Sequence, residues 1–155
     1  STPKPSSAAS DVYKRQIANN ASISGAEGGC QAEIGSASAM AAAALVCAKG
    51  GTPHQAAQAV AITLKNMMGL ICDPVAGLVE VPCVKRNALG SSQAFISADM
   101  ALAGIESVIP PDEVVLAMYQ VGRQMPSIFK ETAEGGLAMT PTAQRLQAEI
   151  LEANR

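Results

Sequence analysis

Aromatic residues are scarce in this sequence: it has no Trp, two Tyr and two Phe, which together make up 3% of its 155 residues. A β-sandwich core normally draws on aromatic and β-branched side chains, so this scarcity disfavours that class. Charged residues are also few, at 15%, whereas hydrophobic residues reach 48%, which excludes intrinsic disorder for most of the chain. The apolar content is mostly small or aliphatic, and it favours closely packed helices.

The sequence also lacks an excess of positive charge and a long hydrophobic run. Its 11 Lys and Arg against 13 Asp and Glu give a formal net charge of −2. It therefore lacks the electrostatic footprint of a general nucleic-acid or membrane-surface binder. The longest apolar run, Ala37 to Ala48, is shorter than the roughly 20 residues that cross a bilayer, and no secretory signal is recognisable. We expect a soluble, cytoplasmic protein.

The hydrophobic pattern and the capping residues predict helices and require no strands. Thr52 and Thr140 each precede a proline suited to the first helical position, and Gln55 completes a capping box with Thr52. The helices expected are 33–49, 52–69, 87–107, 110–125 and 140–151. The first is apolar or small on nearly every face, which predicts a buried central helix. We expect an all-α fold, an Ala-rich helical bundle with Gly- and Pro-rich loops that carry cysteines.

Two of these helices have apolar stripes at helical spacing. The stripe in 87–107 is Phe95, Ala98, Leu102 and Ile105, and that in 110–125 is Val114, Val115, Met118, Val121 and Met125. Because spacings of three and four residues place side chains on one face of a helix, we expect both stripes to face the core.

Residues 1–16 differ in composition from the rest of the chain. Pro, Ser and Lys dominate them and no helical or strand period is found, which predicts a disordered leader. The stretch SSAASDVYKRQ within them also resembles translated adaptor sequence. On that interpretation the leader is non-native, and the native part begins near Ile17.

Four cysteines without an export signal do not indicate a disulfide framework, which leaves metal binding, catalysis or plain burial. Cys30 follows Gly28–Gly29, Cys72 precedes Asp73–Pro74 and Cys83 follows Pro82. At each position a loop can turn a thiolate inward near backbone N–H groups. Cys47 lies in mid-helix among Ala, Leu and Val, where it acts as a small hydrophobe. The spacings of 42 and 11 residues between the first three match no zinc-ribbon or ferredoxin pattern, so inert packing stays open.

Three stretches give a stronger signal: SISGAEGGCQAEIGSASAMAAA, NMMGLICDPVAGLVEVPCVKRNALG and ETAEGGLAMTP. Together they resemble the α subunit, or α domain, of the iron-sulfur L-serine dehydratases, over essentially all of residues 17–155. The resemblance implies that 17–155 is the C-terminal part of such a domain. It also implies that Cys30, Cys72 and Cys83 bind a [4Fe–4S] cluster, while Cys47 matches no cluster ligand.

The resemblance further implies a lyase (an L-serine ammonia-lyase) that converts L-serine to pyruvate and ammonia without pyridoxal phosphate. Three protein ligands leave one iron with an open position, and that iron would act as a Lewis acid on the β-hydroxyl. The catalytic base is unknown. His54, the only histidine, fits a solvated or capping role better than a catalytic one. Lys65, Asp73, Lys85 and Arg86 flank the ligand segments and could orient a carboxylate, but surface, turn or capping roles are favoured for them. Glu27, near Cys30, either supports the ligand or is simply part of the loop.

The α region of that family is roughly twice as long as this chain. The resemblance therefore implies two missing partners, an N-terminal part of the α region and a β subunit or β domain, and we expect the 155-residue chain to be inactive alone. We also expect an oligomer, because Ala-rich helices leave apolar surface to cover. Two alternatives stay open: a structural zinc or helical packing module, and an interaction subunit that completes a partner's active site.

Overall fold

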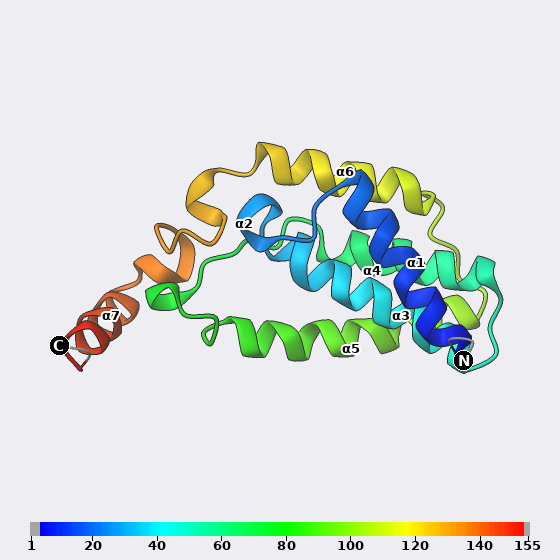
Figure 1. Ribbon diagram of the computed structural model, residues 1–155, viewed down its shortest axis with the longest axis horizontal. Helices are drawn as coiled ribbons and strands as arrows, with labels where there is room; N and C mark the ends of the chain where they lie inside the picture. The colour runs from blue at the N-terminus through cyan, green and yellow to red at the C-terminus, as the bar shows by residue number, and fades with distance from the viewer. Residues whose placement is uncertain (1–3, 154–155) are drawn as a thin grey trace.

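The computed structural model describes residues 4–153, and it is helical throughout, as the sequence predicted (Figure 1). The α-helices are α1 (Pro5–Asn20), α2 (Gly25–Gly28), α3 (Ser36–Ala48), α4 (Pro53–Met67), α5 (Cys83–Leu102), α6 (Pro111–Gln124) and α7 (Pro141–Ala153). Shorter turns are the π-helix η1 (Gln31–Gly35) and the 3₁₀ turns η2 (Val75–Gly77), η3 (Ser127–Phe129) and η4 (Gly136–Met139). Within residues 4–153 the only extended pairing is an isolated bridge between Cys72 and Lys130.

Helix α3 lies at the centre of the bundle, packed against α1, α4 and α5. Its inward residues Ala39, Ala42, Ala43 and Val46 are fully buried. Small side chains allow neighbouring helices to approach closely, and this confirms the predicted central helix. The continuous helix Cys30–Ala48 has 19 residues and a mean hydropathy of 1.3, so by length and composition alone it could cross a membrane. Because 61% of it is buried inside the fold, it is better explained as a core helix.

The start of α4 confirms the predicted capping box. The Thr52 Oγ1 accepts a hydrogen bond from the Gln55 backbone N–H at 3.2 Å, and the Gln55 Oε1 accepts one from the Thr52 N–H at 2.9 Å. These bonds satisfy two backbone donors that the first turn of a helix leaves unpaired. The predicted stripe of α6 is also largely confirmed, because Val114, Val115 and Met118 are buried.

The prediction for 87–107 was wrong in its bounds and only partly right in its stripe. Ala98 is buried and Leu102 packs against the core, but Phe95 and Ile105 are exposed. Helix α5 begins at Cys83, directly after Pro82, and ends at Leu102, before Gly104 at a φ of +86°. Its buried face consists of small residues, with Ala94, Ser97, Ala98 and Ala101 inside, whereas Phe95 is 54% exposed. The hydrophobic pattern favoured the large apolar residues, but the Ala-rich helix α3 accepts only small side chains at this contact.

The disorder expected for residues 1–16 differs from what the structure describes. From Pro5 onward these residues belong to α1, while residues 1–3 lie outside the described part. Pro5 is at the first helical position, and Ala9 and Tyr13 pack against the core near the fully buried Ile17. The composition did not indicate this helix, because most of its residues are polar and exposed and only a few contact the core.

Candidate functional site

Three loops meet at the end of the bundle away from the chain's N-terminus (Figure 1). Cys30 directly follows the first of them, after Gly29, whose φ is +75°, and it begins the continuous helix Cys30–Ala48. A Cβ at Gly29 would lie 2.7 Å from the Met125 sulfur and 2.9 Å from the Leu70 carbonyl oxygen, so only glycine fits this approach. The chain then enters the π-helix η1, a geometry found frequently at functional sites.

The side chain of Gln31 fixes this turn in place. It is buried, donating from Nε2 to the Met118 carbonyl at 3.0 Å and accepting at Oε1 from the Gly69 N–H at 2.9 Å. These bonds tie the turn after Cys30 to α6 and to the end of α4. The structural role of Gln31 was not predicted, because a buried amide side chain has no recognisable pattern in a single sequence.

Cys72 lies on the second loop, in the short bridge with residues 129–131. Its backbone N–H donates to the Phe129 carbonyl at 2.9 Å, and its carbonyl accepts from the Glu131 N–H at 3.2 Å. Cys83 is the first residue of α5, directly after the Val81–Pro82 peptide. Both thiols are therefore held where regular helix stops or starts, as the positions of Asp73–Pro74 and Pro82 in the sequence indicated.

The structure brings Cys30, Cys72 and Cys83 together and leaves Cys47 elsewhere. The first two belong to one buried cluster and are each 1% exposed, and Cys83 is 8% exposed. All four cysteines are free thiols. Cys47 is half-buried against the main core, where burial, and after it the Cys47 thiol, raises the pKa of Tyr13.

The pKa shifts of the three thiols reflect this proximity. Burial is the largest cause and raises the pKa of each one. The neighbouring Cys30 and Cys83 raise the pKa of Cys72 further, and Cys30 does the same for Cys83. Hydrogen bonding to Cys72 and to Arg86 lowers the pKa of Cys30 without cancelling the effect of burial. A sulfur-bound cation would offset the charge that these thiolates carry when they are gathered together.

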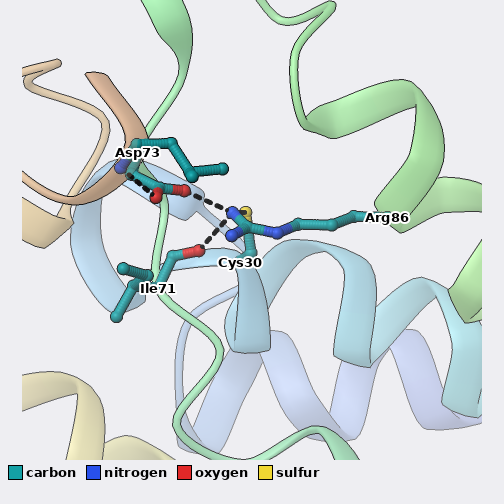
Figure 2. A network of polar contacts seen from close by, with 5 residues as sticks. Cys30, Ile71, Asp73 and Arg86 are labelled. Carbon is teal, nitrogen blue, oxygen red and sulfur yellow. Dashed lines mark hydrogen bonds and ion pairs between the residues drawn. The ribbon is translucent and has the colours of Figure 1, made fainter. Parts of the chain in front are cut away.

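Arg86 and Asp73 form an ion pair beside Cys30 (Figure 2). The guanidinium Nη1 lies 2.6 Å from the Asp73 Oδ1, donates to the Ile71 carbonyl at 2.9 Å and lies 3.9 Å from the Cys30 sulfur. The side chains are 16% and 2% exposed, respectively. Burial lowers the pKa of Arg86, but the bonds to Asp73 and Cys30 outweigh it and the net shift is upward. A fixed positive charge therefore lies beside a thiol.

Asp73 also connects the site to the segment near residue 137. Its Oδ2 accepts a hydrogen bond from the Leu137 N–H at 2.8 Å. A Cβ at Gly136 would lie 2.4 Å from that same oxygen, and the φ of Gly136 is +58°, so this close approach requires glycine. The capping or turn role favoured for Asp73 and Arg86 in the sequence analysis therefore understated them, because they form a buried ion pair between loops.

Two carboxylates that the sequence analysis did not single out lie near Cys72. A Cβ placed on Gly25 would be 2.9 Å from Glu33 Oε2, 3.6 Å from Glu131 Oε2 and 3.5 Å from the Cys72 sulfur. Glu131 has a φ of +65°, in the left-handed region that non-glycine residues rarely adopt. Neither feature was visible beforehand, because the π-turn and the left-handed residue are set by tertiary packing.

The remaining candidate polar residues lie away from the thiols or on the surface. His54 is 66% exposed and faces Glu106 at 3.4 Å, at the start of α4, whose 15 residues place it about 22 Å from the other end of that helix. Lys65 donates to the Ser107 carbonyl at 2.6 Å, Lys85 is exposed, and Glu27 accepts from Ser22. These positions agree with the surface and capping roles favoured for them.

The three thiols could bind either a single metal ion or a cluster of several irons. Within residues 4–153 no three His, Cys, Asp or Glu side chains are close enough to hold one ion. Thiolates that share one tetrahedral zinc lie about 3.8 Å apart, given Zn–S bonds of about 2.3 Å. In a cluster of several irons each thiolate binds a different iron, so the sulfurs lie further apart. The hydrogen bond between Cys30 and Cys72 keeps their sulfurs close, and the three buried thiols supply sulfur donors of the kind that either a zinc ion or an iron-sulfur cluster takes.

The structure is an all-α bundle with three buried free thiols at one end. Such thiols are the usual ligands of a metal ion or an iron-sulfur cluster, so the fold and the site define a helical protein that can bind an inorganic group through sulfur. Comparison with known families then gives the relationship: the chain belongs to the serine dehydratase alpha chain family, whose pattern matches residues 7–138. The all-α fold and the family resemblance predicted from the sequence are both confirmed.

Similar proteins carry the same description. Over 134 residues the chain is 69% identical to the probable L-serine dehydratase alpha chain of Bacillus subtilis and 60% identical to that of Latilactobacillus sakei. Over 136 residues it is 57% identical to the L-serine dehydratase alpha chain of Peptoniphilus asaccharolyticus. The matches cover 86 to 88% of this chain but 45%, 64% and 47% of those relatives. The chain thus spans about half to two thirds of their length.

Proposed function

We propose that this chain is the cluster-binding part of the α chain of an iron-sulfur L-serine dehydratase, a cytoplasmic lyase that releases pyruvate and ammonia. The observation that carries the proposal is the convergence of three buried thiols in a member of the serine dehydratase alpha chain family. Cys30, Cys72 and Cys83 would hold a [4Fe–4S] cluster. Cys47, packed against the main core, would take no part in it.

When bound, such a cluster supplies a Lewis-acid iron that favours departure of the β-hydroxyl of serine. The chain's own residues prepare the place for it. Burial of the three thiols keeps water from competing for the ligands. Arg86, held by Asp73, keeps a positive charge next to the Cys30 sulfur, which offsets part of the negative charge on a thiolate. The exposed carboxylates of Glu33 and Glu131 lie near Cys72.

The rest of the activity is assigned to parts outside this sequence. More than half of the B. subtilis and P. asaccharolyticus α chains has no counterpart here, and their name as alpha chains implies a separate β partner. We assign the catalytic base and the serine contacts to the missing N-terminal part of the α region and to the β subunit or domain, assembled as an oligomer. His54 is too far from the thiols to serve as the base.

The test is an assay of pyruvate formed from L-serine after anaerobic reconstitution with iron and sulfide. We expect no turnover by this chain alone, and turnover when residues 17–155 replace the matching segment of the B. subtilis α chain co-expressed with its β chain. In that hybrid, Cys72→Ser should abolish pyruvate formation and Cys47→Ser should leave it within about twofold of the unmodified hybrid.

Two results would contradict this assignment. Substantial turnover by the isolated chain would show that no essential group is missing. Full activity of the Cys72→Ser hybrid would remove the cluster ligand from the mechanism and favour the alternative of an interaction module that completes a partner's active site. Colour and metal analysis distinguish a zinc site from an iron-sulfur cluster. A reconstituted iron-sulfur protein is brown and bleaches in air, whereas a zinc protein is colourless.

A further inference from the structure

An apolar groove lies between α3 and α5, and Ser6 of α1 also lines part of it. We call it the α3–α5 groove; its walls include Ala37, Ala41, Ala44 and Ala48 of α3 and Ser91 and Phe95 of α5. It consists of two adjoining hollows of about 160 and 440 Å³ that share Ala41 and Ser91. Within residues 4–153 none of the side chains lining either hollow is charged.

The shape and chemistry of the groove suit a packed helix. The four alanines recur at spacings of four, three and four residues, which places them along one face of α3. Ala37, Ala41 and Ala48 are exposed, and Phe95 projects beside them at 54% exposure. A floor of small residues lets another helix axis approach to about 8–10 Å, and an exposed phenylalanine provides a side for it to pack against.

We propose that the α3–α5 groove is filled by a helix from the part of the α chain that this sequence lacks. The match covers 45% of the B. subtilis α chain and 47% of the P. asaccharolyticus α chain, so more than half of each is available to cover it. These α chains are separate polypeptides by name. A separate polypeptide that covers this uncharged groove with its own residues removes an exposed apolar surface before it meets its partner.

Two other occupants are distinguished by the tests below. A second copy related by a two-fold axis would set the same patch of each chain against the other. A β chain would reach the groove only after association, and the α chain would expose it until then. The proposal concerns helix packing alone and involves no iron. Its tests can therefore fail while the proposed function holds, and the reverse is also true.

The first test compares thiol accessibility at one groove position in two contexts. Ala41→Cys is introduced in this chain and at the matching position of the full-length B. subtilis α chain, and alkylation of the new thiol is followed by peptide mass spectrometry. We expect the rate to fall by roughly tenfold or more in the full-length chain, because the position becomes covered. The control is Gln120→Cys, an exposed position on α6 that lies outside the α3–α5 groove, whose rate should stay within about twofold.

The second test identifies the occupant. A photo-crosslinking residue replaces the residue that matches Phe95 in the full-length B. subtilis α chain, and the linked peptides are sequenced. We expect links to the unmatched part of the same polypeptide. Equal alkylation rates at the Ala41 position in both contexts would overturn the proposal. Links to a second α chain, or protection that arises only when the β chain is added, would overturn it as well.

Discussion

At the scale of a single residue, Arg86 is the side chain that connects the segments carrying the thiols. It begins on the first turns of α5, and its guanidinium reaches the carboxylate of Asp73, the carbonyl of Ile71 and the sulfur of Cys30. Because Asp73 in turn binds the Leu137 N–H, one ion pair connects α5 and the Cys72 loop with the start of η4. The charge of Asp73 is almost wholly buried and depends on this partner.

We predict that Arg86→Gln lowers the free energy of unfolding by about 3–5 kcal/mol, because it leaves a buried carboxylate without its cation. Urea denaturation of the variant and the unmodified chain measures the difference. The matched control is Lys49→Gln, which breaks the exposed pair between Lys49 and Asp99 and should cost less than about 1 kcal/mol. Equal, small losses for both variants would show that the Arg86–Asp73 pair does not hold the loops together.

Predictions for single residues from the sequence succeeded where local chemistry decides and failed where packing decides. The separation of Cys47 from the other thiols followed from its place in an apolar helix, and the structure places it against the main core. The roles of Arg86, Asp73, Glu33 and Glu131 were missed or understated because they depend on loops that meet only in the folded chain. No spacing in the sequence places the Glu33 and Glu131 carboxylates near Cys72.

At the scale of elements, helix starts were predictable when their caps were. Thr52 and Gln55 form the capping box that opens α4, and Thr140–Pro141 opens α7. Helix α5 begins without such a signal, at Cys83 after Pro82, and no side chain caps it. The π-turn η1 was also invisible, since its sequence reads as ordinary helix. The buried face of α5 was partly misassigned because its neighbour α3 selects small residues, which hydrophobicity alone does not rank.

The capping box gives a prediction at this scale. Thr52→Ala removes the acceptor for the Gln55 N–H and should lower the free energy of unfolding by about 1 kcal/mol. Differential scanning calorimetry would record this as a drop in melting temperature. Thr142→Ala serves as the control, because Thr142 is an exposed residue of α7, outside the capping box of α4. If the two variants melt at the same temperature, the cap contributes nothing measurable to α4.

At the scale of the whole molecule, the fold explains how distant parts of the sequence form one site. Cys30, Cys72 and Cys83 are separated by 42 and 11 residues, yet the α3–α4 and α3–α5 contacts turn the three loops to the same end of the bundle. The family resemblance predicted which thiols belong together, whereas spacing did not. Under the proposal made above, the α3–α5 groove is covered by a part of the α chain that has no counterpart in this sequence.

Iron and acid-labile sulfide content of the anaerobically reconstituted chain tests the central claim most directly, with each cysteine replaced by serine in turn and folding checked by circular dichroism. The account predicts that Cys47→Ser binds as much iron per chain as the unmodified protein. It predicts that Cys30→Ser, Cys72→Ser and Cys83→Ser each lose roughly half or more of it. An unmodified chain without iron, or a Cys47→Ser variant that loses as much iron as the other three, would contradict the account.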